Sequence, residues 1–405
     1  VGGIIKAVYS SSNGLEKRPK LRFPGFDESY RTTPLGEIAS LVNRTDPKSN
    51  APIMMLSAGN GFIMQSEKYS RDNAGQSLKK YILLKQGELA YNHGASKAKQ
   101  FGCCYELTEP EARIPYVYHC FKINDHEYTP FIAMALNNAK MDKQLKRLVS
   151  SSVRMDGLLN ISFEDYMSVT LHLPSSTEQK HIADFLKKID ERIAAQEKLL
   201  ASLKKYKRGL LMHYFSDDKT QLWTQCSVSQ IGKVITGSTP PTNDRSNYDG
   251  DLLFCAPGDV GEQKYISSTE KRVSPKGFAL GRPLPPNSVI VTCIGLIGKL
   301  GIAKTSMITN QQINALVVSE GFDHEFIYYA FENFFPEYRS KVSMQTLPIL
   351  SKSEFEKLMI KVPDLDVQHK ISSHLAAMDR RIEHTQQELN ALIEHRRGIM
   401  QQLFI

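Results

Sequence analysis

Two stretches of the chain carry the same spacing of apolar residues, and each predicts one long helix. Across residues 182–214 and 371–403, apolar residues recur at alternating steps of four and three. A 3.5-residue period held over about four to five heptads is typical of a coiled-coil seam. The predicted seam consists of Ile182, Leu186, Ile189, Ile193, Leu200, Leu203, Leu210, Ile371, Leu375, Met378, Ile382, Leu389, Leu392 and Ile399.

Polar residues interrupt the two seams at equivalent places, Gln196 with Thr385 and Lys207 with Arg396. Such residues lower the stability of a coiled coil but fix its register. Because the two narrow seams match, we expect the helices to pair with each other. The alternative is two amphipathic helices that pack separately on their own domains.

The chain is an internal duplication, and its second half repeats the first. Residues 161–216 align with residues 350–405 at a constant offset of 189 and without a gap. The residues that recur include Ser162, Pro174, Gln179, Ile182, Leu186, Asp190, Arg192, Ile193, Leu200, Arg208, Gly209 and Phe215. The beginnings of the halves match more loosely, so the repeated units are residues 28–216 and 217–405.

The short linker between the halves predicts the direction of the helix pair. Each helix of roughly 35 residues spans about 50 Å, and residues 216–222 are too few to lead the chain back that far. We therefore predict an antiparallel coiled coil with pseudo-two-fold symmetry and a globular part at each end. The predicted divisions are 1–27 (N-terminal extension), 28–174 (first domain), 175–216 (central helix), 217–363 (second domain) and 364–405 (C-terminal helix).

Short apolar runs broken by Gly, Pro and Asn indicate that each globular part is a mixed α+β domain. The expected strands are residues 81–84, 90–92, 117–123, 252–255, 288–293 and 315–318. One helix is expected in each domain, over residues 131–148 and 324–335. The predicted fold class is thus α+β, with two domains separated by two long helices.

The composition excludes several classes of protein. Of 405 residues, 41% are hydrophobic and 23% are charged, which is enough apolar material for two cores. No apolar run approaches the roughly 18 residues of a membrane span, and residues 1–12 lack signal-peptide features, so we expect a cytoplasmic protein. Six cysteines without a C-x-x-C pair favour reduced thiols. The net charge of +8 indicates an acidic partner only weakly.

The sequence lacks recognisable catalytic motifs. Residues 295–299 resemble a phosphate-binding loop but miss its first Gly and its final Ser or Thr. Asp251, Glu262 and Lys264 imitate the acid–acid–lysine pattern of nucleases, a spacing that arises readily by chance. The sequence has no glycine-rich cofactor fingerprint and no adenine-methyltransferase tetrad, and no histidine has further metal ligands at a suitable spacing. We predict no catalytic and no metal-binding residues.

Donor-rich loops in both domains carry the candidate binding chemistry. They are residues 91–99 in the first domain and 236–245, 295–299 and 309–312 in the second. Asn and Gln suit bidentate contact with adenine, whereas Arg and Lys suit guanine and phosphate. Each loop alone is also explained as a solvated turn, and 295–299 and 310–312 as buried turns that stabilise the sheet.

A set of short motifs follows one order along the whole chain. They lie at residues 19–26, 91–94, 152–157, 173–180, 189–193, 207–211, 237–240, 256–259, 284–289, 297–299 and 309–315. Together with the alternation of domain and long helix, this order resembles the specificity (S) subunit of type I restriction–modification systems. Residues 43–46 differ from the Gly-Ser-Thr-Pro at 237–240. The resemblance therefore implies that the two domains are of different subtypes and should read different DNA sequences.

The resemblance implies a non-catalytic subunit that recognises DNA. Each target recognition domain would read about three or four base pairs in the major groove, and the coiled coil would set the unread spacer between the half-sites. The implied partners are double-stranded DNA, two methyltransferase (M) subunits that bind S-adenosylmethionine, and two restriction/translocase (R) subunits. This chain would bind no cofactor; it would select the adenine that the methyltransferase flips and modifies.

The loops supply the residues that we predict to contact DNA. These are Asn92, His93, Ser96, Lys97, Lys99, Arg154, Ser238, Thr239, Arg245, Lys299, Asn310, Gln311 and Gln312. Two other classes stay open from the sequence, a Mg²⁺-dependent nuclease and a purely structural coiled-coil adaptor. The DNA target itself cannot be derived, because base readout depends on loop geometry and DNA shape.

Overall fold

The chain divides into two compact units, each of which contains one domain and part of both long helices. The computed structural model describes residues 6–7, 18–68, 75–96, 99–149, 159–341 and 348–405. Unit 1 consists of Val1–Ala195 and Glu388–Ile405, and unit 2 of Gln196–Gln387. Residues distant in sequence, near the start and the end of the chain, therefore share one unit.

Both units mix short strands with helices. Up to the first long helix, the elements are β1 (Lys6–Ala7), β2 (Leu21–Arg22), β3 (Arg31–Pro34), α1 (Leu35–Ile38), β4 (Ala39–Leu41), β5 (Met54–Ser57), β6 (Gly61–Met64), α2 (Gln65–Lys68), η1 (Gly75–Lys80), β7 (Ile82–Lys85), β8 (Leu89–Asn92), β9 (Cys103–Glu106), β10 (Glu111–Ile114), β11 (His119–Ile123), α3 (Thr129–Leu136), α4 (Ala139–Leu148), α5 (Phe163–Met167), β12 (Thr170–Leu173) and α6 (Ser176–Tyr214). The rest of the chain forms α7 (Asp217–Thr220), β13 (Thr224–Ser227), α8 (Val228–Ile231), β14 (Gly232–Thr236), η2 (Arg245–Asn247), β15 (Tyr248–Cys255), η3 (Pro257–Asp259), β16 (Tyr265–Ile266), β17 (Lys271–Val273), α9 (Pro275–Leu280), β18 (Val289–Thr292), β19 (Leu300–Ala303), β20 (Met307–Thr309), β21 (Ile313–Val318), α10 (His324–Lys341), α11 (Lys352–Lys357), β22 (Met359–Val362) and α12 (Leu365–Leu403).

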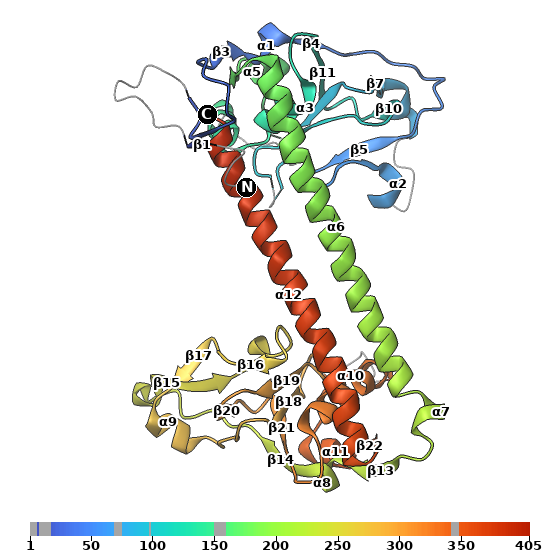
Figure 1. Cartoon of the computed structure of the whole chain (residues 1–405), viewed down its shortest axis with the longest axis vertical. Coiled ribbons are helices and arrows are strands. Elements are labelled where there is room, and N and C mark those ends of the chain that lie inside the picture. The colour runs from blue at the N-terminus through green and yellow to red at the C-terminus, as the bar shows by residue number, and fades with distance from the viewer. Residues whose placement is uncertain (1–5, 8–17, 69–74, 97–98, 150–158, 342–347) are drawn as a thin grey trace. The chain divides into compact units, whose positions relative to one another are not determined.

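The two domains are built on the same sheet. Unit 1 has the strand order β4-β11-β8-β9. Unit 2 has the order β14-β21-β18-β19-β16, and these five strands are labelled in Figure 1. The first four strands of each order pair antiparallel with their neighbours. A two-stranded ribbon that leads into the long helix also recurs, as β3 with β12 and as β13 with β22. The duplication seen in the sequence is therefore a duplication of topology.

Most of the expected elements are present, with two corrections in the helices. The six expected strands overlap β7, β8, β11, β15, β18 and β21, and three of them, 81–84, 117–123 and 288–293, were expected to begin one or two residues too early. The single helix expected over 131–148 is wrong: it is broken at Asn137 and Asn138, because Asn138 caps α4 by accepting from two backbone N–H groups. The helix expected over 324–335 continues through Pro336 to Lys341 as α10.

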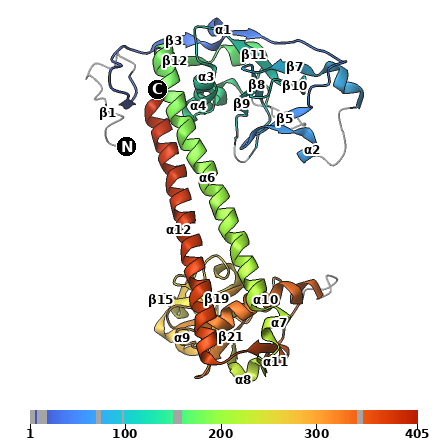
Figure 2. The ribbon, with the colours of Figure 1, turned by 45° about the vertical axis from the view of Figure 1, so that its right-hand side comes forward.

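In each unit, the portions of α6 and α12 lie side by side and run antiparallel (Figure 2). In unit 1, Arg396 forms a bidentate ion pair with Asp190, with Nη2 and Oδ2 2.9 Å apart. In unit 2, the Nζ of Lys207 lies 2.7 Å from the Oδ1 of Asp379. The predicted α+β fold with an antiparallel helix pair is confirmed, and all fourteen predicted seam residues are buried or half-buried.

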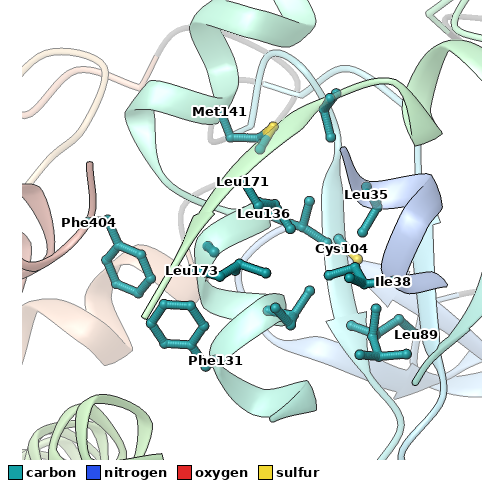
Figure 3. Close-up of a cluster of buried hydrophobic side chains, with 14 of the residues drawn as sticks. Leu35, Ile38, Leu89, Cys104, Phe131, Leu136, Met141, Leu171, Leu173 and Phe404 are labelled. Atoms are coloured by element: carbon teal, nitrogen blue, oxygen red, sulfur yellow. The ribbon is translucent and has the colours of Figure 1, made fainter. Parts of the chain in front are cut away.

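The aromatic end of each long helix packs on the domain of its unit. In unit 1, Phe404 at the end of α12 stacks on Phe131 of α3, with ring centroids 5.1 Å apart (Figure 3). In unit 2, Phe215 just after α6 packs on Phe326 of α10 at 5.6 Å. Because these contacts are equivalent, the recurrence of Phe215 and Phe404 in the sequence reflects one packing requirement used twice.

A buried glutamine joins each long helix to its domain and explains the repeated Pro-x4-Gln pattern. The Nε2 of Gln179 donates to the Pro174 carbonyl, and its Oε1 accepts the N–H of Tyr128, just before α3. Gln368 makes the same two bonds, to the Pro363 carbonyl and from the N–H of Asp323, just before α10. Each amide thus links the start of a long helix to the start of the helix in its domain.

Candidate nucleic-acid interface

In both domains, the candidate loops leave the same end of the repeated sheet. In unit 2 the antiparallel registers place four strand termini at the same end of the sheet. These are the end of β14, the start of β21, the end of β18 and the start of β19. In unit 1 the ends of β4 and β8 meet the starts of β11 and β9 in the same way. Loops far apart in sequence therefore form one surface in each unit.

In unit 2, the loop after β14 contacts the loop before β21. The N–H of Ser238 donates to the Thr309 carbonyl at 2.8 Å, and the hydroxyl of exposed Thr239 donates to the Oε1 of exposed Gln311 at 2.7 Å. Gly237 is required for this close approach, because a Cβ there would overlap the carbonyl oxygens of Thr309 and Asn310. The structure thus brings three predicted residues together on exposed turns.

The neighbouring residues of this turn are held by bonds within the turn itself. The Oδ1 of Asn310 accepts the N–H of Gln312, and its Nδ2 donates to the Oε1 of Gln312, both at 3.1 Å. The carbonyl of Gln312 accepts the N–H of Cys293, which joins this turn to the β18–β19 loop. The side chains of Asn310 and Gln312 therefore shape the turn, whereas Gln311 is its exposed residue.

The β18–β19 loop is anchored at its base and exposed at its tip. Ile297 is buried, and Gly298 lies against Phe335 of α10 with no space for a Cβ. Leu296 is 65% exposed, and Lys299 is half-buried with its aliphatic chain beside Gly261. The loop is thus a stabilising turn that also presents Leu296 and Lys299 at the candidate surface.

Arg245 lies further along the segment that follows β14. It begins the short helix η2 and is exposed. Asp244, which caps η2, forms a 2.7 Å ion pair with Lys276, and this bond to Lys276 is the main reason that the pKa of Asp244 falls to about 2. The salt bridge and the cap hold the backbone of η2, so that the Arg245 side chain extends from a fixed turn.

In unit 1, two predicted residues at the end of β8 hold the backbone. The Oδ1 of Asn92 accepts the N–H of Gly94 at 2.9 Å. His93 is buried, and its two ring nitrogens each lie 2.9 Å from a carbonyl oxygen, those of Leu159 and Val117. In this conformation neither nitrogen of His93 is free for a base, so its role as a DNA contact stays a prediction.

The remaining predicted residues of unit 1 lie on the loop between β8 and β9 or outside the described residues. Ser96 is exposed, and its hydroxyl accepts the N–H of Lys99 at 3.0 Å. The Nζ of Lys99 donates to the Asn137 carbonyl at the end of α3, at 2.9 Å. Lys97 and Arg154 fall outside the described residues, and their contact with DNA also stays a prediction.

An exposed aromatic residue at this surface was missed by the sequence reasoning. Residues 115–118 precede β11 in unit 1 and occupy the place that Asn310–Gln312 have before β21. Tyr116 is 51% exposed and Val117 is 36% exposed, and the Nζ of Lys80 lies 5.8 Å from the centre of the Tyr116 ring. The apolar run 117–123 had indicated a strand that starts at Val117, whereas β11 begins at His119.

The nuclease-like set of residues does not form a free catalytic group. The Nζ of Lys264 donates to Glu325 at 2.6 Å and to the hydroxyl of Tyr329 at 2.9 Å, both on α10. Its amine is therefore committed to a half-buried network, while Asp251 and Glu262 are exposed. Within the described ranges, no three His, Cys, Asp or Glu side chains gather as a metal site would require.

Burial keeps two of the cysteines in the thiol form. Cys103 and Cys293 are buried, and burial raises the pKa of each thiol to about 11, so both are protonated and unreactive at neutral pH. Among the helices in the described part of the chain, none is long and apolar enough to cross a membrane.

Part of the chain resembles curated type I restriction enzymes. It is 30% identical over 178 residues to the MjaIX specificity subunit of Methanocaldococcus jannaschii, an alignment that covers 42% of this chain and 41% of that protein. It is 29% identical over 108 residues to the HindI specificity subunit of Haemophilus influenzae, covering 26% of this chain and 24% of that protein. Both alignments span less than half of the curated relative.

Solved structures share the fold. The S subunit of a type I restriction–modification system from M. genitalium superposes with a TM-score of 0.62 at 15% identity, over 96% of this chain and 99% of that chain. A chain from a study of complex assembly and conformational transition of the type I R-M system gives a TM-score of 0.56 at 16% identity, over 93% and 97%. At such identities the likeness establishes the fold alone.

The family model agrees with the internal repeat. The model described as "Type I restriction modification DNA specificity domain" matches residues 79–205 and again residues 221–395. These two matches cover most of the chain, with one in each repeated half. The chain therefore belongs to the type I restriction–modification DNA specificity family, as the resemblance in its sequence predicted.

Proposed function

We propose that this chain is the DNA specificity subunit of a type I restriction–modification complex and reads a bipartite target with an unread gap. One observation carries the proposal: the same sheet occurs twice, and equivalent strand ends present different side chains. Before β21 the exposed residue is Gln311, whereas before β11 the exposed residues are Tyr116 and Val117. A repeated sheet with different exposed residues at its strand ends suits two half-sites of different sequence.

The exposed side chains of the loops at these strand ends support contact with DNA. In unit 2, Thr239 and Gln311 offer hydroxyl and amide groups on exposed turns, with Lys299 and Arg245 on neighbouring segments. Such groups pair with base edges in the major groove and with phosphates. In unit 1, the exposed Tyr116 ring beside Lys80 provides an apolar and a cationic contact.

The helix pair gives a physical basis for a fixed gap. In this proposal, α6 and α12 act as a ruler, because a helix adds about 1.5 Å per residue. The ion pairs Asp190–Arg396 and Lys207–Asp379 support one antiparallel register in each unit. The proposed spacer therefore follows from the helix length and the register.

The complex would supply the catalysis. We propose that the helices bind two methyltransferase (M) subunits, which carry S-adenosylmethionine, and that two restriction/translocase (R) subunits join them. This chain would itself be non-catalytic, bind no cofactor and act in the cytoplasm. It would determine which adenine the methyltransferase modifies.

Selection of DNA sites from a random pool, with the methyltransferase subunit present, tests the proposal. We expect a bipartite consensus with a gap of fixed length. Insertion of four residues near Ala201 lengthens the ruler by about 6 Å, so it should change the gap or abolish binding. A consensus without a gap, or an unchanged gap in the insertion variant, would contradict the ruler.

The individual half-sites can be tested by matched substitutions. Gln311→Ala should relax the preference at one position of one half-site, by about 1–3 kcal/mol of discrimination if its amide reads a base. Gln225→Ala is the control, because Gln225 is also exposed but lies on β13, outside the repeated sheet. Mg²⁺-dependent cleavage by the chain alone, lost in Asp251→Ala, would instead support a nuclease.

A further inference from the structure

The repeated sheets differ at one edge. In unit 2 a fifth strand, β16, pairs with β19, and the N–H of Ile302 donates to the Lys264 carbonyl at 2.7 Å. In unit 1 the strand order ends at β9, and no strand of the described residues pairs with its outer edge. An open strand edge is a site where an extended segment can be added.

Backbone geometry identifies which residue of β9 is open. The N–H of Leu107 donates to the Glu88 carbonyl of the neighbouring segment, so by alternation Cys104 and Glu106 direct their backbone groups outward. The Asn137 side chain occupies the first of these positions, since its Oδ1 accepts the N–H of Cys104 and its Nδ2 donates to the Cys104 carbonyl. Glu106 is the counterpart of Ile302 and has no such backbone partner within the described ranges.

Beside this edge lies a cavity of about 730 Å³ in unit 1. Its wall includes Pro130, Ala133 and Met134 of α3 and Asn137 directly after α3. The equivalent residues of α10 are Glu325, Tyr328, Tyr329 and Glu332. Two of these, Glu325 and Tyr329, hold the amine of Lys264 in unit 2. Smaller or apolar residues in α3 thus leave hollow the space that a lysine and its partners fill in unit 2.

The charges at the cavity favour a cation. Glu106 and Glu109 line it, and in the described part of the chain neither carboxylate forms a salt bridge, although the positive charge of Lys187 acts on Glu106. The two cationic side chains of the wall are already engaged, Lys99 with the Asn137 carbonyl and Arg396 with Asp190. Unpaired carboxylates would repel a DNA phosphate and attract a lysine or arginine.

We propose that the outer edge of β9 binds an extended segment of a partner protein as an added strand. The backbone of that segment pairs with Glu106, and a lysine or arginine of the segment enters the cavity beside Glu106 and Glu109. The chain itself provides a precedent for the added strand and the inserted lysine, because β16 pairs with β19 and Lys264 enters unit 2, where Glu325 and Tyr329 of α10 hold its amine. The cavity wall includes Lys99 of the β8–β9 loop, whereas the open backbone position is on β9, and the proposal does not depend on the proposed function.

A peptide with the sequence of residues 260–268 is the probe, because this segment supplies β16 and Lys264 in unit 2. Added to the full-length chain, it should bind and slow hydrogen exchange at the Glu106 amide. Replacement of the lysine by alanine in the peptide, or Glu106→Gln in the chain, should weaken binding by about tenfold or more, as expected for the loss of one charge-assisted contact.

A second variant and a control separate this site from non-specific attraction. Ala133→Tyr fills the cavity with the side chain that unit 2 has at Tyr328, and it should abolish binding. Glu111→Gln, on β10 and outside the cavity wall, should leave binding unchanged. The proposal is overturned if the peptide does not bind at about 1 mM, if binding leaves exchange at Glu106 unaltered, or if the lysine of the peptide makes no difference.

Discussion

The buried side-chain amide of Gln368 links the start of α12 to the domain of unit 2, and its loss should lower the stability of that unit. Its side chain is 2% exposed, and it bonds the N–H of Asp323 and the Pro363 carbonyl, both at 2.9 Å. Gln368→Leu keeps most of the volume but leaves a backbone donor and a backbone acceptor without partners. Each unsatisfied buried group costs about 1–3 kcal/mol, so we expect unit 2 to lose about 2–5 kcal/mol of stability.

The chain carries its own probe for this measurement. Trp223 is the only tryptophan, and its ring packs on Phe215 and Phe326 in unit 2, with centroids 5.9 and 5.8 Å away. Its fluorescence therefore reports the unfolding of the unit that contains Gln368. At a urea m-value of about 2 kcal/mol/M, the midpoint should fall by about 1–2.5 M.

Two matched substitutions decide whether the reasoning holds. Gln179→Leu breaks the equivalent bonds in unit 1. It should lower the urea midpoint measured by far-UV circular dichroism and should shift the midpoint of the Trp223 fluorescence transition less. Gln387→Leu removes an exposed glutamine of the same helix and should change stability by no more than about 0.5 kcal/mol. If Gln368→Leu shifts the midpoint no further than Gln387→Leu does, the two buried bonds do not join helix and domain as argued.

Four further changes test the charges and the binding surface. Burial keeps the pKa of His119 below 6.5, so its stabilising contribution is present above pH 6.5 and lost as the pH falls; urea unfolding at about pH 5.5 should show this loss, and His119→Gln should reduce it. Burial raises the pKa of Tyr329 well above 10, so the free energy of unfolding should decline as the pH rises above 10, and this decline should be smaller in Tyr329→Phe. Lys299→Ala should flatten the salt dependence of DNA binding by about 0.9 log units per log unit of salt if Lys299 contacts one phosphate; an unchanged slope would remove it from the interface. Tyr116→Ala should weaken DNA binding at one half-site while leaving the urea midpoint unchanged, and equal loss at both half-sites would contradict its placement.

The periodic parts of the molecule were predictable because local patterns determine them. The spacing of apolar residues by alternating steps of four and three predicted both long helices. The constant offset of 189 residues between matching positions predicted the repeat. The sequence also showed Lys207 and Arg396 as polar interruptions of the seams. It did not show that their partners are Asp379 and Asp190, since those contacts join residues 172 and 206 positions apart and exist only in one antiparallel register.

The candidate site was predicted less completely, because its residues lie on turns. The loops with Thr239 and Gln311 were identified from their donors, and the structure joins them by a direct hydrogen bond. His93 has the same polar character in the sequence, yet it is buried between two carbonyl oxygens. Tyr116 was not identified as a candidate, because it directly precedes the apolar run 117–123, and a strand and the turn before it have similar composition. Side-chain type does not distinguish these environments.

The sequence by itself determined the two-fold repeat, the paired helices and the family, because all three depend on residue order and period. Only the tertiary structure decided which loops share a surface, since the strand order places the ends of β14 and β18 beside the start of β21. It also decided that, among the described residues, no strand pairs with the outer edge of β9, whereas β16 pairs with β19. Such differences arise from long-range pairing of backbone groups, which side-chain patterns along the chain do not record.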